Sequence, residues 1–393
     1  MRIGIDCRTI LNPDKERFTG IEHYTYQLVR HLLKIDKKNQ YVLFFDRSIK
    51  EKRIDKFKKK NTIIRYFPFS QYSKFLPVIY SHFLVNAFIA REKLDVFHSP
   101  TPYLPKSYRG PAVVTVHDLF NFKFPQWSSS EEWRYNKKVV SSALKNSSKI
   151  ISVSQSTKRD IINLFKIKPS KIRVVYNGVD ARFFQKAGDK EVKRVKRKLG
   201  ISGDYILYLG ALSKRKNIVN IINSFEEIKE EKEGRKYKFK NLKLVLAGKQ
   251  TGDNKKKILR MVKHSKFKKD IILTGYVEPD DINPLYEGAK IFLFPSFYEG
   301  FGLPLLEAAA KGLPIITSST SSLPEIADGA ALLVDPNKKK EISFAIFTLL
   351  TDKKLVRELS RKAKARAKKF SWLETARKTL KVYKEVKRKS NVL

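Results

Sequence analysis

The feature that most constrains the fold of this chain is a repeated alternation between short apolar runs and longer stretches with helical spacing. The apolar runs are rich in β-branched and aromatic residues, and they form two similar series along the 393 residues. This alternation predicts an α/β protein with parallel sheets built from strand–helix–strand units and covered by helices on both faces. The strands expected in the first series are residues 2–7, 41–46, 62–67, 95–98, 112–117, 150–153 and 173–176. Those expected in the second series are residues 205–210, 242–247, 271–274, 291–295, 314–317 and 331–334.

Helices between the strands are indicated by apolar residues at helical spacing and by capping residues. One helix is expected over 21–35, where the spaced positions are Tyr24, Leu28, Leu32 and Ile35. Ser154 directly follows a predicted strand and is expected to cap a helix that ends near Phe165. The lysine-rich insertion at 230–240 is interpreted as a surface loop.

Two domains are expected, because a chain of this length exceeds what one hydrophobic core usually serves. The polar stretch 185–203 separates the two series of strands and is the predicted linker. The predicted domains are therefore residues 1–185, together with about 373–393, and residues 186–372. Ligands bind such sheets outside the carboxyl ends of the strands, so functional residues are sought just after strands in both halves.

Composition narrows the location and excludes some kinds of site. Cys7 is the single cysteine, which rules out an intrachain disulfide and a cysteine-rich metal site and suits a reducing compartment. Residues 1–6 carry a charge within their apolar run and are interpreted as a strand rather than a signal peptide. No run of 18 uninterrupted apolar residues occurs, so no membrane-spanning helix is expected. The expected location is the cytoplasm, or the inner face of the cytoplasmic membrane as a peripheral protein.

The chain is strongly basic, with a formal net charge of +43 from 82 lysines and arginines against 39 acidic residues. Such a charge favours anionic partners: nucleic acid, acidic lipid headgroups or phosphorylated small molecules. The alternative is that solvated surface helices carry the lysines without a specific partner. Neither zinc-finger spacing nor an RNP-type aromatic motif occurs, so nucleic-acid binding is the less favoured function.

The segment 295–308 combines a strand end, a glycine-bearing turn and the start of a helix. The predicted strand ends at Pro295, and the predicted helix begins at Gly302 and Leu303, whose free N–H groups offer a natural seat for a diphosphate. Glu299 and Glu307 are separated by seven residues, one in the loop before the helix and the other inside it. They can therefore address different parts of one extended ligand.

Cations follow the first strand of the second series. Arg215 and Lys216 lie shortly before a helix expected to begin near Asn217. Fixed cations and backbone donors at such a position can stabilise negative charge on phosphate oxygens without a metal. No Asp-x-Asp sequence occurs, and the six histidines show no metal-ligand spacing, so no metal site is expected.

Two segments of the first half also follow strands. His117 and Asp118 lie at the carboxyl end of the predicted strand 112–117, directly after Val116, and an imidazole near neutrality can donate or accept a hydrogen bond. The first strand leads to a loop that ends at Gly20, where a helix opens. Glu22 and His23 follow in the first turn of that helix.

Together these segments closely resemble the signature of retaining glycosyltransferases of the GT-B fold, especially glycosyltransferase family 4. In that family the first glutamate contacts hydroxyls of the transferred sugar and the second holds the nucleotide ribose, which places Glu299 and Glu307 in these roles. The resemblance implies that Arg215, Lys216, Gly302 and Leu303 bind the donor diphosphate. It also implies that His117 contacts the donor sugar near its reacting centre.

Other positions match the family less closely. Gly20 corresponds to a loop glycine that approaches donor and acceptor, but Glu22 stands where a second glycine is common. Glu22 and His23 are therefore candidates for contact with acceptor hydroxyls instead. Tyr276 and Val277 correspond to the region near the nucleobase. Ala211 stands where many relatives carry an arginine, which weakens any assignment of a donor subclass. The match is strong over roughly 150–375 and looser before it.

The resemblance implies a fold and a function. The fold is two Rossmann-like domains that face each other across a deep cleft, with a helix after Trp372 crossing back to the first domain. The function is retaining, metal-independent transfer of a hexosyl unit, with mannosyl favoured, from GDP-mannose or a UDP-sugar to a glycan or lipid-linked acceptor. No other cofactor is implied. A nucleotide-sugar epimerase of the same fold is the nearest alternative.

A basic and aromatic region suggests contact with a membrane. Lysines at 50–60 precede an apolar and aromatic stretch that runs to Ile79. This composition suits an anionic bilayer, where peripheral binding would give access to a lipid-linked acceptor. The alternative is an ordinary core helix at 75–90 beside solvated lysines.

Overall fold

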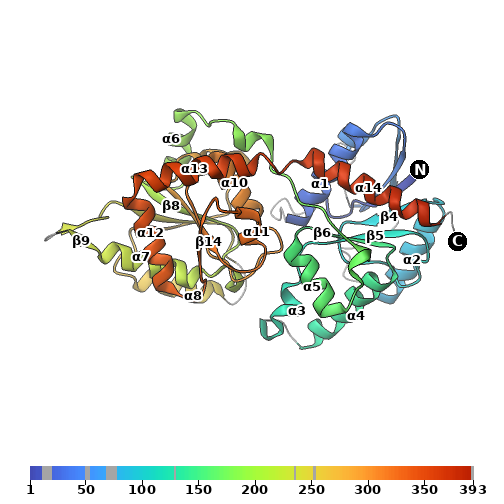
Figure 1. Ribbon diagram of the computed structural model, residues 1–393, viewed down its shortest axis with the longest axis horizontal. Helices are drawn as coiled ribbons and strands as arrows, with labels where there is room; N and C mark the ends of the chain where they lie inside the picture. The colour runs from blue at the N-terminus through green and yellow to red at the C-terminus, as the bar shows by residue number, and fades with distance from the viewer. Residues whose placement is uncertain are drawn as a thin grey trace. The chain divides into compact units, whose positions relative to one another are not determined.

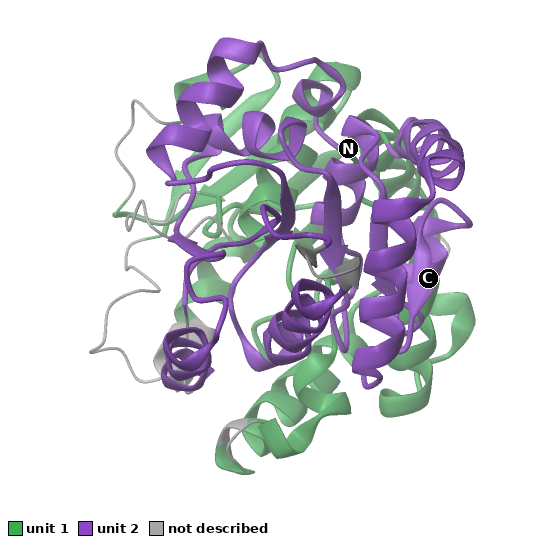
Figure 2. Ribbon diagram, turned by 90° about the vertical axis from the view of Figure 1, so that its left-hand side faces the viewer, with its two compact units in different colours: residues 1–178, 371–393 green, residues 179–370 purple. Residues whose placement is uncertain are grey.

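The computed structural model describes residues 1–10, 20–48, 54–67, 78–127, 130–233, 236–250 and 254–390. The chain forms two compact units: Met1–Gly178 with Ser371–Leu393, and Val179–Phe370 (Figure 2). Much of the basic and aromatic stretch, from 49–53 and from 68–77, lies outside the described residues. In the described part of the chain, no helix is both long and apolar enough to cross a membrane.

The first unit is built on a parallel sheet of seven strands in the order β3-β2-β1-β4-β5-β6-β7. Its strands match the predicted ones within one or two residues at most ends: β1 (Arg2–Asp6), β2 (Gln40–Phe45), β3 (Thr62–Tyr66), β4 (Val96–Ser99), β5 (Ala112–Val116), β6 (Lys149–Ser152) and β7 (Ile172–Val174). The strand order reverses direction between β1 and β4. Sheets of this kind bind ligands near such a switch point, at the carboxyl ends of the strands.

Helices cover both faces of this sheet. They are α1 (Gly20–Ile35), α2 (Val78–Ala90), α3 (Phe120–Lys123), α4 (Ser130–Asn146), α5 (Gln155–Phe165) and α14 (Trp372–Ser390). In Figure 1, β5 and β6 lie between α14 on one side and α4 and α5 on the other. Ser154 caps α5 as predicted, because its side chain accepts a hydrogen bond from the backbone N–H of Thr157. The C-terminal helix belongs to the first unit, which confirms the expected return of the chain.

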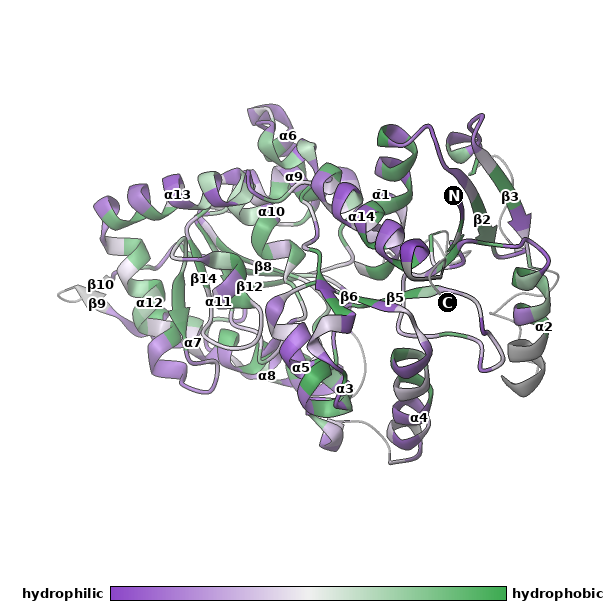
Figure 3. Ribbon diagram, turned by 45° about the vertical axis from the view of Figure 1, so that its right-hand side comes forward, coloured by the Kyte–Doolittle hydropathy of each residue, from purple (hydrophilic) through white to green (hydrophobic). Residues whose placement is uncertain are grey.

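The second unit has a parallel sheet of six strands in the order β12-β11-β8-β13-β14-β15. The strands again match prediction closely: β8 (Tyr205–Leu209), β11 (Lys243–Ala247), β12 (Ile271–Gly275), β13 (Ile291–Phe294), β14 (Ile315–Ser318) and β15 (Leu332–Val334). Its helices are α6 (Asp189–Lys198), α7 (Ile218–Glu230), α8 (Asn254–His264), α9 (Pro279–Glu287), α10 (Leu303–Lys311), α11 (Leu323–Ala327), α12 (Lys339–Thr351) and α13 (Lys353–Ala367). In Figure 3 the strands of both sheets are mostly hydrophobic, whereas α13 and α14 carry hydrophilic turns.

Two expectations about polar segments are wrong. The predicted linker 185–203 contains α6, which packs on α9 through ion pairs from Arg194 and Lys198 to the buried carboxylate of Asp281, at 2.8 and 2.6 Å. The sequence of α6 has the polar composition of a linker because Val195 is the sole buried residue of this helix. The insertion at 230–240 is not a plain loop, since it forms a short antiparallel pair of strands, β9 (Lys232–Glu233) and β10 (Lys236–Tyr237).

Candidate active site

Asn217 ties together three loops at the carboxyl ends of the second sheet. It follows the short helix η6 (Lys214–Lys216), adopts φ of 62° and forms the N-cap of α7. Its side-chain amide donates hydrogen bonds to the carbonyl oxygens of Pro295 at 3.0 Å and Pro336 at 2.7 Å. The amide therefore joins the loops after β8, β13 and β15. The sequence predicted a helix start near Asn217 but did not indicate that its side chain connects these loops.

Close backbone packing fixes the loop after β8 against the loop after β11. Gly248 has φ of 139°, and a Cβ atom at this position would lie 2.0 Å from the carbonyl oxygen of Gly210. Only glycine fits such an approach. The two loops are therefore packed tightly together just before the basic residues that follow Gly210.

A run of hydroxyl side chains holds the loop that carries Glu299. The backbone N–H of Glu299 donates to the hydroxyl of Ser321 at 3.0 Å. The hydroxyl of Ser322 lies within hydrogen-bond distance of the carbonyl oxygens of Glu299 and Phe301, at 2.9 and 3.1 Å. Thr320 donates to the carbonyl of Phe297 at 3.0 Å. These residues were missed by sequence reasoning, although an unbroken Ser/Thr stretch directly after a predicted strand was available as a signal.

The structure brings Lys216 and Glu299 into direct contact. The Nζ atom of Lys216 lies 2.5 Å from Oε1 of Glu299, and the two side chains are only 11% and 8% exposed. The same ammonium group lies 4.9 Å from the centre of the Phe294 ring. Removing one partner of a buried ion pair costs about 3–5 kcal/mol, so each charge here depends on the other. A cation expected to hold phosphate and a carboxylate expected to hold sugar therefore share one site.

Arg215 is anchored beside this pair through its backbone. Its carbonyl oxygen accepts a hydrogen bond from the N–H of Phe297 at 3.0 Å, which links η6 to the loop after β13. Burial raises the pKa of Tyr208 well above its ordinary value, and the guanidinium charge of Arg215 acts in the opposite direction. Two predicted phosphate-binding residues thus sit on the same short helix, next to the predicted sugar-binding glutamate.

Glu307 lies on α10 in closely packed surroundings. Burial raises the pKa of Glu307 to about 7, although a hydrogen bond from Tyr286 and the charge of Arg182 act in the opposite direction. The hydroxyl of Tyr286 lies 3.0 Å from Oε2 of Glu307. A carboxyl group with such a pKa changes its charge close to neutral pH.

The N-terminus of α10 forms as predicted. Gly302 is its N-cap and has φ of 97°, a conformation that favours glycine. Leu303 is the first helical residue, and Pro304 occupies the first turn, where its missing N–H carries no cost. The positive end of this helix lies directly after the loop that carries Glu299.

His117 follows β5 in the first unit and has a defined tautomer. Its Nε2 atom lies 2.8 Å from the carbonyl oxygen of Pro100, which can only accept, so Nε2 carries the hydrogen. Burial lowers the pKa of His117 below 6.5. The neutral ring therefore offers Nδ1 as a hydrogen-bond acceptor. The ring also packs edge-on against Tyr24 at a centroid distance of 4.7 Å.

A buried polar network lies behind His117, and sequence reasoning missed it. The Nδ1 atom of His98 lies 2.6 Å from the hydroxyl of Tyr383 on α14, and its Nε2 atom lies 2.8 Å from the hydroxyl of Thr115. Thr115 in turn contacts the hydroxyl of Tyr24 at 3.2 Å. Because His98 and Tyr383 are 285 positions apart, no local pattern in the sequence signals this contact.

The remaining candidate residues of the first unit, at the start of α1, differ in their surroundings. Gly20 is the first residue of α1, and a Cβ atom placed there would meet nothing within 4 Å. Glu22 is only 4% exposed, and the ring of His23 packs against Trp372 at 5.6 Å. Glu22 and His23 are thus packed into the unit.

The region predicted to lie near the nucleobase follows β12. Tyr276 is 36% exposed, whereas Val277 is buried at 5%. The ammonium group of Lys249, from the loop after β11, lies 5.8 Å from the centre of the Tyr276 ring. Within the described ranges, no group of three or more His, Cys, Asp or Glu side chains could hold a metal ion.

Known proteins resemble this chain in sequence and in fold. Residues 18–183 match the family model for Glycosyltransferase Family 4, and residues 189–369 match that for glycosyl transferases group 1. O-antigen chain mannosyltransferase B of Escherichia coli is 30% identical over 382 residues, which cover 95% of this chain and 97% of that protein. The solved structure of WaaG, a glycosyltransferase involved in lipopolysaccharide biosynthesis, has a TM-score of 0.74 and 14% identity, covering 97% of this chain and 99% of that one.

A third relative acts on a lipid-linked substrate by its name. It is the N-acetylgalactosamine-N,N'-diacetylbacillosaminyl-diphospho-undecaprenol 4-alpha-N-acetylgalactosaminyltransferase of Campylobacter jejuni, 29% identical over 251 residues, which cover 63% of this chain and 62% of that protein. The alternative of an epimerase receives no support from these relatives. Three findings agree: the two parallel sheets, the glutamate and basic residues that follow strands of the second sheet, and the near full-length match. The chain therefore belongs to glycosyltransferase family 4 and is a glycosyltransferase of the GT-B fold.

Proposed function

We propose that the protein transfers a hexosyl unit from a nucleotide-diphosphate sugar with retention of configuration and without a metal ion. The observation that carries this proposal is the cluster at the strand ends of the second unit, where Lys216 meets Glu299 at 2.5 Å beside the N-terminus of α10. Buried cations and free helix N–H groups can stabilise the charge that develops on a departing diphosphate.

The proposed donor lies along this cluster. Its diphosphate contacts Arg215, Lys216 and the helix start at Gly302 and Leu303, and Glu307 accepts hydrogen bonds from the ribose hydroxyls. When Lys216 turns to phosphate, sugar hydroxyls replace it as donors to Glu299. The nucleobase then lies towards the segment that contains Tyr276 and Val277.

The proposed sugar contacts involve His117 and Glu299. Because His117 is neutral at pH 7 and carries its hydrogen on Nε2, its Nδ1 atom accepts a hydrogen bond from a sugar hydroxyl. The acceptor hydroxyl attacks on the face that the leaving group vacates, near Gly20, and retention follows.

Mannose is the favoured sugar, and a glycan or lipid-linked molecule is the favoured acceptor. The near full-length relative is a mannosyltransferase by name, and the Campylobacter jejuni relative names a diphospho-undecaprenol substrate. Peripheral contact with a membrane that carries such an acceptor is part of the proposal, although α2 buries Val85 and Ile89 in the core, as the alternative of a core helix expects, and leaves Leu84 38% exposed.

A thermal-shift panel tests donor binding. The protein is heated with GDP-mannose, UDP-glucose, UDP-N-acetylglucosamine and free nucleotides, each with and without EDTA. A ligand at 100 times its dissociation constant stabilises the fold by about 2.7 kcal/mol, which raises the melting temperature measurably. A selective shift that EDTA does not change supports the proposal and identifies the donor. A shift that EDTA abolishes contradicts the metal-free site, and no shift with any ligand contradicts the proposal.

A further inference from the structure

The hydroxyl group of Tyr286 lies between two oxygen atoms of α10. It is 3.0 Å from Oε2 of Glu307 and 3.2 Å from the carbonyl oxygen of Pro304. The side chain is fully buried, at 0% exposure, and its ring is fixed edge-on by Phe183 and Phe292 at centroid distances of 5.9 and 5.5 Å. The position of the hydroxyl is therefore set by the core of the unit.

A tyrosine hydroxyl has one hydrogen, so it donates fully to only one of these oxygens at a time. When Glu307 is ionised, its carboxylate only accepts, and Tyr286 directs its hydrogen to Oε2. When Glu307 is protonated, the carboxyl hydrogen can be donated to the oxygen of Tyr286, whose own hydrogen then turns to the carbonyl of Pro304. Both charge states of Glu307 are thus satisfied by one fixed side chain.

The charges around Glu307 do not hold it in one state. Burial raises the pKa of Glu307 to about 7, and Asp180 acts in the same direction, whereas Tyr286 and Arg182 lower it. Two lysines lie on the packed elements. Lys311 on α10 pairs with Glu287 on α9 at 2.5 Å, and the aliphatic stem of Lys364 on α13 lies against Gly312.

We propose that Tyr286 is a positioning residue for the nucleotide site, which holds the Glu307 carboxyl group and couples donor binding to the release of one proton. The inference rests on the proposed function, because it needs ribose hydroxyls to donate to Glu307. Two hydroxyl donors favour the carboxylate form, which accepts at both oxygens, whereas a protonated carboxyl group donates one hydrogen and keeps less acceptor capacity. A donor that meets protonated Glu307 therefore displaces its proton to the buffer, and the hydrogen of Tyr286 returns to Oε2.

The test measures donor affinity against pH by isothermal titration calorimetry. The probe is the nucleotide sugar that gives the largest thermal shift. A nucleotide sugar is used rather than a free nucleotide because its diphosphate is esterified at both ends and has no group that titrates near neutrality. For a carboxylate with a pKa of about 7, affinity rises about tenfold between pH 6 and pH 8. Repeating the titration in buffers of different ionisation enthalpy counts the protons released.

Three variants separate positioning from packing. Tyr286→Phe keeps the ring and removes the hydroxyl, and we expect the midpoint of the profile to rise by about one pH unit, because the carboxylate loses a donor. Glu307→Gln should remove this titration from the profile. Tyr205→Phe is the matched control: Tyr205 is equally buried and donates to the carbonyl of Leu285 at 2.6 Å, but that acceptor does not titrate. Its profile should stay at the wild-type midpoint.

The outcomes distinguish this inference from the function on which it rests. If the donor binds and Tyr286→Phe leaves the midpoint unchanged, or Tyr205→Phe shifts it equally, the inference is wrong and the proposed function stands. If the wild-type protein binds no nucleotide sugar at any pH between about 5.5 and 8.5, a range that spans the expected titration, both are overturned. A shift confined to Tyr286→Phe, with proton release in the wild type, supports the inference.

Discussion

At the scale of single residues, the site is defined by side chains whose charge depends on a neighbour. Lys216 and Glu299 compensate each other, and the charge of Glu307 is set by burial and by Tyr286. His117 is neutral because it is buried. The sequence supplied the identities of these groups through their place after strands. It could not supply their pairing, because Lys216 and Glu299 are 83 positions apart and meet only after the sheet has formed.

His98 should make the stability of the first unit depend on pH. Burial lowers the pKa of His98 to about 3, whereas an unfolded histidine has a pKa of about 6.5. Below pH 6.5 this histidine therefore binds a proton in the unfolded chain but not in the folded chain, and the free energy of unfolding decreases as the pH falls. From pH 7 to pH 5 the loss attributable to His98 is about 2 kcal/mol.

Urea denaturation followed by near-ultraviolet circular dichroism at both pH values checks this expectation. His98→Gln should lose less stability between pH 7 and pH 5 than the wild type does. His264→Gln, on the exposed face of α8, is the matched control and should behave as the wild type. Equal pH dependence in His98→Gln and the wild type would show that His98 is not the group responsible.

At the scale of elements, the sequence predicted strands and caps well and polar segments poorly. Strands were predictable because buried parallel strands are apolar throughout, and the cap at Ser154 is a local pattern. Helix α6 was missed because its stability depends on a distant partner, as the contact of Arg194 and Lys198 with Asp281 shows. The pair β9–β10 was missed because each strand has only two residues, too few for a recognisable strand pattern. The hydroxyl stretch 318–322 was visible in the sequence, but its partners in the loop that carries Glu299 were not, because they are more than 20 positions away.

Asn217 should be required for the arrangement of the loops around Lys216. Asn217→Gly keeps the left-handed backbone but removes two buried hydrogen bonds, each worth about 0.5–1.5 kcal/mol. We expect a loss of about 1–3 kcal/mol in unfolding free energy and a weaker affinity for the nucleotide sugar. Chemical denaturation and calorimetry measure the two effects.

Asn220→Ala provides the comparison for this variant. Asn220 also donates to the carbonyl of Pro336, at 2.9 Å, but it is less buried and has no contact with Pro295 in the described interactions. A smaller effect on both measurements is expected. If Asn220→Ala weakens donor binding as much as Asn217→Gly does, the junction of the three loops is not what positions Lys216.

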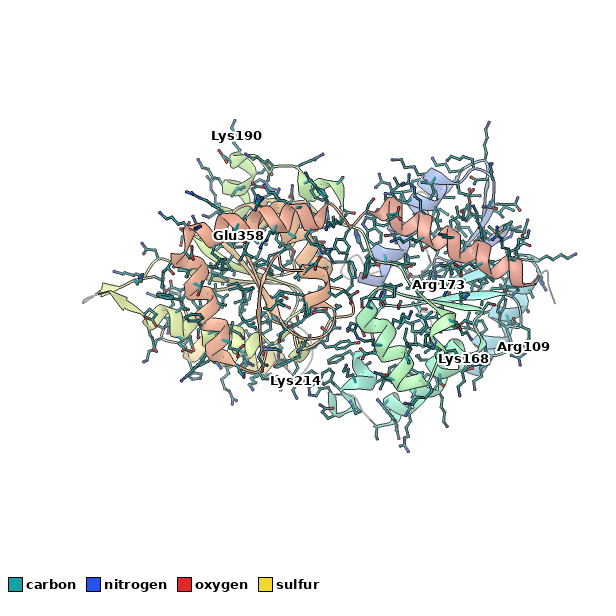
Figure 4. All side chains as sticks on the ribbon, in the orientation of Figure 1. Arg109, Lys168, Arg173, Lys190, Lys214 and Glu358 are labelled. Carbon is teal, nitrogen blue, oxygen red and sulfur yellow. The ribbon has the colours of Figure 1, made fainter. Side chains whose placement is uncertain are left out.

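At the scale of the whole molecule, the two units and the net charge of +43 are the main properties. Charged side chains project from the outer elements of both units, among them Arg109, Lys168 and Lys190 (Figure 4). The return of α14 to the first unit was predictable from the family resemblance. Its contact through Tyr383 with His98 was not, because nothing in the local sequence indicates it.

The charge should produce salt-dependent binding to anionic membranes. Each cation near an anionic surface contributes about 1 kcal/mol, and salt screens the attraction. We expect the protein to co-sediment with phosphatidylglycerol vesicles at low ionic strength, to be released as salt is added, and to stay in solution with phosphatidylcholine vesicles. Failure to bind anionic vesicles even at low salt would refute peripheral membrane binding.

The measurement that tests the central claim most directly is the affinity of the nucleotide sugar for two lysine variants, determined by calorimetry with EDTA present. Lys216→Met removes the buried cation next to Glu299, and Lys214→Met removes an exposed cation from the same short helix (Figure 4). The account predicts that Lys216→Met weakens binding at least about tenfold, the loss expected for a charged hydrogen bond, while Lys214→Met changes it less than about threefold. Unchanged affinity in Lys216→Met, or equal losses in both variants, would contradict a donor diphosphate held by Lys216.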